Sequence, residues 1–93
     1  MPTNPTKWTL VFTQKANKVF KKLDREAYRK VTAFIDNSLL KADNPRTFGK
    51  PLTGNLKEFW CYRVGDYRLI CELHDHVLTI SVIKIGHRKE VYD

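Results

Sequence analysis

The sequence predicts an α+β fold, with two helices packed on one face of an antiparallel sheet. Apolar residues recur at helical spacing over residues 13–40, and they alternate with other residues between positions 58 and 85. One short apolar run precedes the helical part, so the expected order is an N-terminal strand, a two-helix hairpin and a β-meander. A chain of 93 residues has room for one domain, which we expect to span residues 1–93.

The N-terminal part of the chain supplies the first strand and both helices. Residues 1–6 contain two prolines and are otherwise mostly polar, so we expect a loose arm. The run from Trp8 to Phe12 is a strand by residue type. Thr13 can cap a first helix, and Asp24 ends it and can cap a second helix from about Arg25 to Leu40.

A long connection covers residues 43–57 and carries two lysines, Lys50 and Lys57. Compact domains seldom keep so long a connection without a use. A few residues between Phe48 and Leu52 are expected to add an edge strand. The remaining strands are predicted at 58–64, 67–73 and 77–85.

The dipeptide Gly65-Asp66 lies between two alternating runs and signals a two-residue hairpin turn. This turn sets Arg63 opposite Arg68, and residues directly opposite each other share a face. The core side is then predicted to hold Trp60, Tyr62, Val64, Tyr67, Leu69, Cys71 and Leu73. The other side is predicted to hold Phe59, Cys61, Arg63, Arg68, Ile70 and Glu72.

The next turn is less well defined by the sequence. A turn at His74-Asp75 puts Ser81 beside Arg68, although a three-residue turn is also open. Thr79 and Ser81 are expected on the arginine side, and the core side gains Leu78, Ile80 and Val82.

The two opposed arginines point to an anion-binding site. Like charges directly opposite each other repel, and a phosphate held between them reverses that effect. Two guanidinium forks also suit phosphate oxygens better than ammonium groups do. The alternative is that Glu72, Asp66 or a terminal carboxylate neutralises the pair.

The overall charge agrees with a polyanionic partner. The chain has 17 Lys+Arg against 10 Asp+Glu, a formal charge of +7 and a pI of about 9.6. Nucleic acid is the commonest partner of so basic a small domain. The alternative is a solvated basic surface that only aids solubility.

The C-terminal residues add further candidates. Gly86 is expected to end the last strand, and His87, Arg88 and Tyr92 follow it. Histidine exchanges protons near neutral pH, although a surface role for His87 is the alternative. Tyr92 can stack on a base or share a proton, or it can pack the terminus against the sheet.

Two cysteines and the absence of a long apolar run bear on location. Cys61 and Cys71 have no metal-ligand spacing, and the predicted register puts them on opposite faces, so they cannot form a disulfide. Unpaired thiols suit a reducing cytoplasm. No apolar run approaches the ~20 residues that span a bilayer, and no signal region begins the chain. We expect a cytoplasmic protein with no membrane association.

The motif Tyr62-Arg-Val-Gly-Asp-Tyr-Arg-Leu-Ile, followed by Lys84-Ile-Gly-His-Arg-Lys-Glu-Val-Tyr, resembles the RelE branch of the RelE/ParE toxins. The resemblance runs from Trp8 onward. It implies the toxin of a bacterial type II toxin–antitoxin pair, which cuts mRNA in the ribosomal A site without metal or cofactor. The ribose 2′-hydroxyl attacks the adjacent phosphate in such enzymes.

The resemblance also implies roles for individual residues. Arg68 and Arg88 would stabilise the scissile phosphate, Arg63 would assist, and Tyr92 would stack on or activate the nucleotide. The expected partners are a RelB-like antitoxin, the ribosome and mRNA, with operator DNA bound only through the antitoxin.

The chain departs from the RelE pattern on the strand before the turn. Two lysines of the best-known RelE type are replaced by Phe59 and Cys61. Lys50, Lys57 or His87 are the alternatives for a proton-transfer group. Two other functions stay open, a ParE-like inhibitor of DNA gyrase that cuts nothing and a basic module that only binds nucleic acid.

Overall fold

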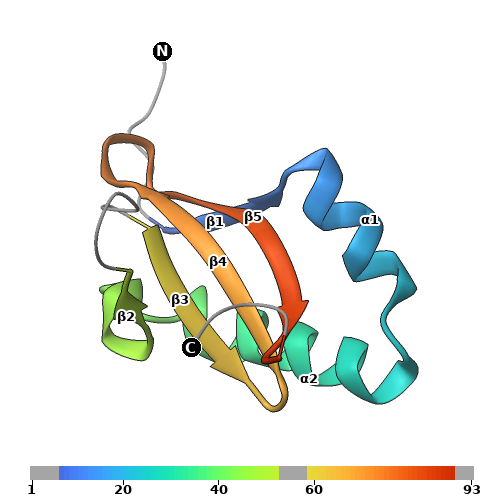
Figure 1. The fold of residues 1–93 in the computed structure, drawn as a ribbon. Helices are drawn as coiled ribbons and strands as arrows, with labels where there is room; N and C mark the ends of the chain where they lie inside the picture. Colours follow the sequence, from blue (N-terminus) through green and yellow to red (C-terminus); the bar gives the residue numbers. More distant parts are fainter. Residues whose placement is uncertain (1–6, 53–58, 90–93) are drawn as a thin grey trace.

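The computed structural model describes residues 7–52 and 59–89. Five strands form one sheet in the order β1-β5-β4-β3-β2, and the helices lie on one face of it (Figure 1). The expected α+β class is confirmed. The elements are β1 (Thr9–Phe12), α1 (Gln14–Lys22), α2 (Arg25–Phe34), β2 (Lys50–Pro51), β3 (Phe59–Val64), β4 (Tyr67–His74) and β5 (Thr79–His87).

Both helices begin at the caps that the sequence predicts. The Thr13 hydroxyl accepts a hydrogen bond from the Ala16 amide at 3.1 Å, and the Asp24 carboxylate accepts one from the Ala27 amide at 2.8 Å. Each bond satisfies an amide that has no partner inside its helix. The second helix continues beyond α2 as a π-helical turn, Ile35–Leu39, and so covers almost all of the predicted range.

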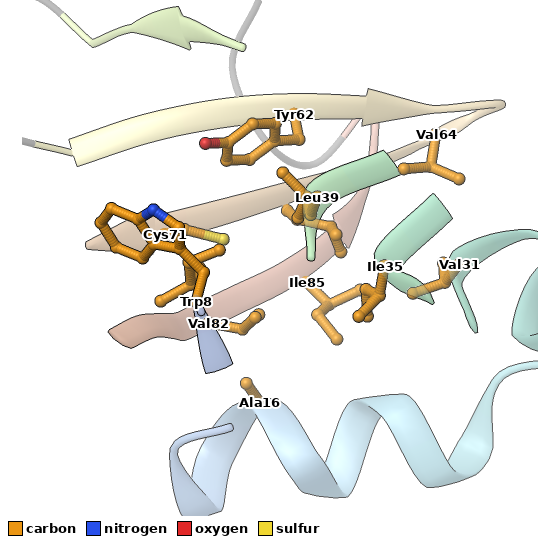
Figure 2. Packing of buried hydrophobic residues seen from close by; sticks show 12 residues of the cluster. Trp8, Ala16, Val31, Ile35, Leu39, Tyr62, Val64, Cys71, Val82 and Ile85 are labelled. Atoms are coloured by element: carbon orange, nitrogen blue, oxygen red, sulfur yellow. The ribbon is translucent and has the colours of Figure 1, made fainter. Parts of the chain in front are cut away.

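A hydrophobic core fills the space between the helices and the sheet (Figure 2). Ala16 from α1 and Val31 from α2 are fully buried, as are Tyr62, Leu69 and Val82 from the sheet. Burying one large apolar side chain contributes about 1.5–3 kcal/mol. The alternating residues of the sheet therefore attach both helices to the same face.

The β3–β4 hairpin has the predicted register at every pair from Val64↔Tyr67 to Trp60↔Cys71. Gly65 has φ +59°, and Asp66 does not have a positive φ. This pattern is that of a type II′ turn, which needs glycine at its first central position. Because the register is as predicted, Cys61 and Cys71 lie on opposite faces and do not form a disulfide with each other.

The register of β5 differs from the prediction. A 3-10 turn at Asp75–Val77 and a left-handed residue, Leu78, make the connection longer than two or three residues. Ser81 therefore lies opposite Glu72 rather than beside Arg68, and Arg68 lies opposite Gly86. Compared with the predicted register, the longer turn shifts β5 along β4 by an even number of residues. Ile80 and Val82 therefore still face the core, as expected.

The sheet is mixed rather than wholly antiparallel. β1 pairs with β5 in parallel, with Leu10 opposite Ile80. The first described strand thus pairs with the last strand of the meander. Helices in the described ranges are too short and too polar to span a bilayer.

The connection before β3 is fastened to the sheet by side chains. The Tyr62 hydroxyl donates a hydrogen bond to the Pro45 carbonyl at 3.0 Å, and burial raises the pKa of this phenol. Arg46 donates two hydrogen bonds to Asp75, at 3.0 and 2.8 Å, and lies 5.7 Å from the Trp60 ring centroid. These contacts place the expected edge strand, β2, beside β3.

Candidate phosphate-binding face

The sheet face turned away from the helices carries cations in two neighbouring rows. Strand pairing places Arg63, Arg68 and Gly86 in one row, nearest the β3–β4 turn. The next row runs across four strands and consists of Lys50, Cys61, Ile70 and Lys84. We call this surface the arginine face, defined by Arg63, Arg68, Lys50 and Lys84.

Arg68 lies at the centre of the arginine row and is held in place by the backbone. Its side chain turns toward the hairpin, where Nη1 donates to the carbonyls of Gly65 at 3.2 Å and Tyr67 at 3.0 Å. The residue is only 3% exposed. These two hydrogen bonds hold the Arg68 guanidinium group beside the turn.

Arg88 reaches the same turn from the end of β5. Its amide donates to the Asp66 carbonyl at 2.7 Å, and its Nε lies 3.8 Å from the Asp66 carboxylate. Both side chains are more than half exposed, so this long ion pair contributes little. Asp66 therefore positions Arg88 without removing its charge from reach of a ligand.

Arg63 is exposed and lies opposite Arg68, as the sequence predicts. No carboxylate among the described residues forms an ion pair with it. The third place in this row is occupied by Gly86, which has no side chain. The turn thus brings together three arginines from three different strand ends.

His87 does not join this group. It pairs with Tyr67, whose side of the sheet is that of the core, and the two rings lie 5.7 Å apart. Its Nδ1 accepts a hydrogen bond from the Lys89 amide at 3.2 Å. The strand also extends through His87 rather than ending at Gly86. This geometry favours a packing role over one on the arginine face.

The lysine candidates are divided between described and undescribed parts of the chain. Lys50 is exposed in β2 and shares the arginine face. Lys57 and Tyr92 lie outside the described residues. Within those residues, no cluster of three His, Cys, Asp or Glu side chains is arranged to hold a metal ion.

Lys84 is a cation of this face that the sequence reasoning missed. It is exposed and pairs with Ile70. The sequence did contain a signal. Ile80, Val82 and Lys84 are alternate residues, so a regular strand would put the lysine on the core side with the two apolar residues.

A hollow of about 590 Å³ lies at the opposite end of the sheet from the arginines. It contains none of the predicted site residues and is lined by Lys7, Trp8, Leu40, Lys41, Ala42, Asp43 and Leu78. The charged face, rather than this hollow, therefore carries the chemistry that the sequence predicts.

Comparison with known proteins identifies the family of this chain. Residues 10–92 match the model of the ParE toxin family of type II toxin–antitoxin systems, described as the toxin of parDE. The chain belongs to this family.

Individual relatives place it in the RelE-like branch of the superfamily. Toxin RelG of Mycobacterium tuberculosis is 29% identical over 85 residues, which cover 91% of this chain and 95% of that toxin. The crystal structure of the toxin–antitoxin complex RelBE2 from the same organism contains a chain that matches with a TM-score of 0.79 and 29% identity. That match covers 89% of this chain and 100% of the other.

A more distant toxin shows the same fold. The isolated E. coli RelE toxin matches with a TM-score of 0.69 and 20% identity, over 86% of this chain and 83% of that one. The family model and the RelG relative, together with this shared fold, identify the protein as a RelE-like toxin of a type II toxin–antitoxin system.

Proposed function

We propose that this toxin is a metal-independent endoribonuclease, an mRNA interferase that enters the ribosomal A site and cuts the message there. The observation that carries the proposal is the convergence of Arg63, Arg68 and Arg88 around one hairpin turn. Three guanidinium groups at one place suit a phosphodiester, which is singly charged before attack and gains charge during it.

The proposed reaction is an internal transfer within the RNA. The 2′-hydroxyl oxygen forms a bond to the adjacent phosphorus and loses its proton, the bond from phosphorus to the 5′-oxygen breaks, and that oxygen gains a proton. The products are a 2′,3′-cyclic phosphate and a 5′-hydroxyl end. Fixed donors aimed at the developing charge are effective because they need no reorganisation, and removing one such donor costs about 10²–10³ in rate.

We assign the phosphate contacts to Arg68 and Arg88, with Arg63 assisting. The fixed position of Arg68 supports this role, since the bonds from its Nη1 to the Gly65 and Tyr67 carbonyls hold the guanidinium group in place. Tyr92 is proposed to stack on the nucleotide. Of the proton-transfer candidates, Lys50 is the described residue that shares this face, whereas His87 faces the other way.

The proposed partners follow from the same charge distribution. The chain carries a formal charge of +7, so an acidic segment of a RelB-like antitoxin would complement it. Solved relatives include RelBE and RelE–RelB complexes. We propose that operator DNA is bound only through the antitoxin, and that the toxin works in the cytoplasm on ribosomes and mRNA.

The test is induced expression of the toxin with mapping of mRNA 5′ ends. We expect 5′-hydroxyl ends in phase with codons, and at least a hundredfold fewer of them with Arg88→Ala. The matched control is Lys18→Ala, an exposed lysine on α1, which should cut like the wild type. Growth arrest without new 5′ ends would refute the proposal.

A second function is favoured by the family model itself, which is that of ParE toxins. A gyrase inhibitor would relax plasmid supercoiling before translation slows, and it would leave messages intact. Measuring supercoiling and protein synthesis in the same induced culture separates the two functions. A third possibility, a basic module that only binds nucleic acid, predicts RNA binding with a steep salt dependence and no cleavage.

A further inference from the structure

A one-residue bulge in β5 decides which way Lys84 points. Cys71 pairs with Val82, but the neighbouring Ile70 pairs with Lys84, so Ile83 has no partner on β4. The burial pattern agrees with this register. Val82 and Ile85 are both buried although they are three residues apart, whereas Lys84 between them is exposed.

Regular alternation would give the opposite result for this segment. Lys84 would then share the core side with Ile80 and Val82, and Ile85 would face outward. An unpaired ammonium in that core would be strongly unfavourable. Bulges re-aim side chains in this way and are frequent near functional sites.

The bulge places Lys84 one row from the arginines. It lies two residues before Gly86, which is opposite Arg68. Diagonal neighbours in an antiparallel pair are about 7–8 Å apart, within reach of long side chains. No described carboxylate forms an ion pair with Lys84.

Lys84 belongs to a row of paired residues that crosses four strands. Lys50 lies at the other end of it, and Cys61 and Ile70 lie between the two lysines. Ile70 is buried and Cys61 is half-buried, so the exposed groups of this row are the two lysines at its ends.

We infer that Lys84 binds the RNA backbone phosphate next to the one held by the arginines. This inference rests on the proposed function and adds to it a binding residue outside the arginine cluster. Single-stranded RNA carries one phosphate per nucleotide, so a strand with one phosphate at Arg68 must place a neighbouring phosphate close by. Contact with Lys84 would direct the RNA away from the scissile phosphate across the sheet, from β4 toward β5.

The experiment measures binding of a short 2′-O-methyl RNA, which lacks the attacking hydroxyl and cannot be cut. The observed affinity is followed over a series of salt concentrations for the wild type, Lys84→Gln and Lys84→Arg. Loss of one phosphate contact should lower the slope of log affinity against log salt by about 0.7. Lys84→Arg should keep the wild-type slope because it keeps the charge.

Lys18→Gln is the matched control, because it removes the same charge from α1 on the helix side of the sheet. It should leave the slope unchanged, and the melting temperatures of all variants should agree because both lysines are exposed.

The possible failures of the two proposals are distinct. Equal slopes for Lys84→Gln and the wild type overturn the role of Lys84 and leave the nuclease proposal standing. If the wild type does not bind this free RNA, message cleavage in a translation extract decides instead. Equal cleavage by Lys84→Gln across the salt series then overturns the role of Lys84, and no cleavage by the wild type overturns the nuclease proposal.

Discussion

Gly49→Ala is expected to destabilise the protein because the added β-carbon would crowd the Tyr62 ring. A β-carbon at this position would lie 2.7 Å from Tyr62 Cε1, 3.0 Å from Cδ1 and 3.1 Å from the Cys61 carbonyl oxygen. Ordinary contacts begin at about 3.4 Å, so the ring would have to move by about 0.7 Å, the difference from 2.7 Å. Gly49 has an extended backbone with φ −129°, which alanine adopts without strain.

The ring cannot move freely. Tyr62 is fully buried, and its hydroxyl donates to the Pro45 carbonyl at 3.0 Å. Overpacking a core costs about 1–3 kcal/mol, and losing this hydrogen bond adds about 1 kcal/mol. The lower entropy of the unfolded alanine chain offsets about 0.4–1 kcal/mol. We therefore expect a net loss of about 2 kcal/mol in the free energy of unfolding, which lowers the melting temperature by roughly 10 °C.

The assay is urea unfolding followed by circular dichroism for four proteins, the wild type, Gly49→Ala, Tyr62→Phe and the double variant. Removing the hydroxyl frees the ring to shift, so Gly49→Ala should cost less in the Tyr62→Phe background. A coupling energy of about 1 kcal/mol is expected for residues in direct contact. A Gly49→Ala protein within about 0.3 kcal/mol of the wild type would refute the reasoning, because surface substitutions produce changes of that size.

Two further predictions concern the Arg46–Asp75 ion pair and the buried hydroxyl of Thr32 in α2. The hydrogen bonds from Arg46 lower the pKa of Asp75. The pair therefore stabilises the folded state fully at pH values above the unfolded carboxyl pKa of about 3.9. This stabilisation is lost as the pH falls through the lower pKa of the folded state. Asp75→Asn should thus cost a few tenths to about 1 kcal/mol at neutral pH, because the Asp75 side chain is 57% exposed. In acid, the unfolding curves of the variant and the wild type should converge. Thr32 Oγ1 is buried with no hydrogen-bond partner among the described residues, so Thr32→Val should be neutral or raise stability by up to about 1 kcal/mol. Unfolding in urea checks this, and a loss above 1 kcal/mol would show that the hydroxyl has a favourable role.

Local sequence signals predicted the helices and the β3–β4 hairpin because neighbouring residues decide them. Thr13 and Asp24 cap amides within three residues of themselves. Gly65 supplies the positive φ that a two-residue turn requires. Once that turn forms, the pairing of Arg63 with Arg68 follows from residue count alone.

The register of β5 could not be predicted in the same way. The connection after β4 contains a left-handed leucine, Leu78, with φ +46°, and leucine carries no sequence signal for that conformation. The bulge at Ile83 depends on burying Ile85 against the helices. Both features are set by contacts between distant parts of the chain. The longer connection moved Ser81 away from Arg68, and the bulge turned Lys84 outward.

The sequence by itself determined the strand alternation, the helix caps, the hairpin with its opposed arginines, and the excess of positive charge. Tertiary structure alone decided that Lys84 accompanies those arginines. It also left His87 against Tyr67 on the other side of the sheet. The physical reason is that a side chain's face depends on strand register, and register in β5 is fixed by core burial and by pairing with two other strands.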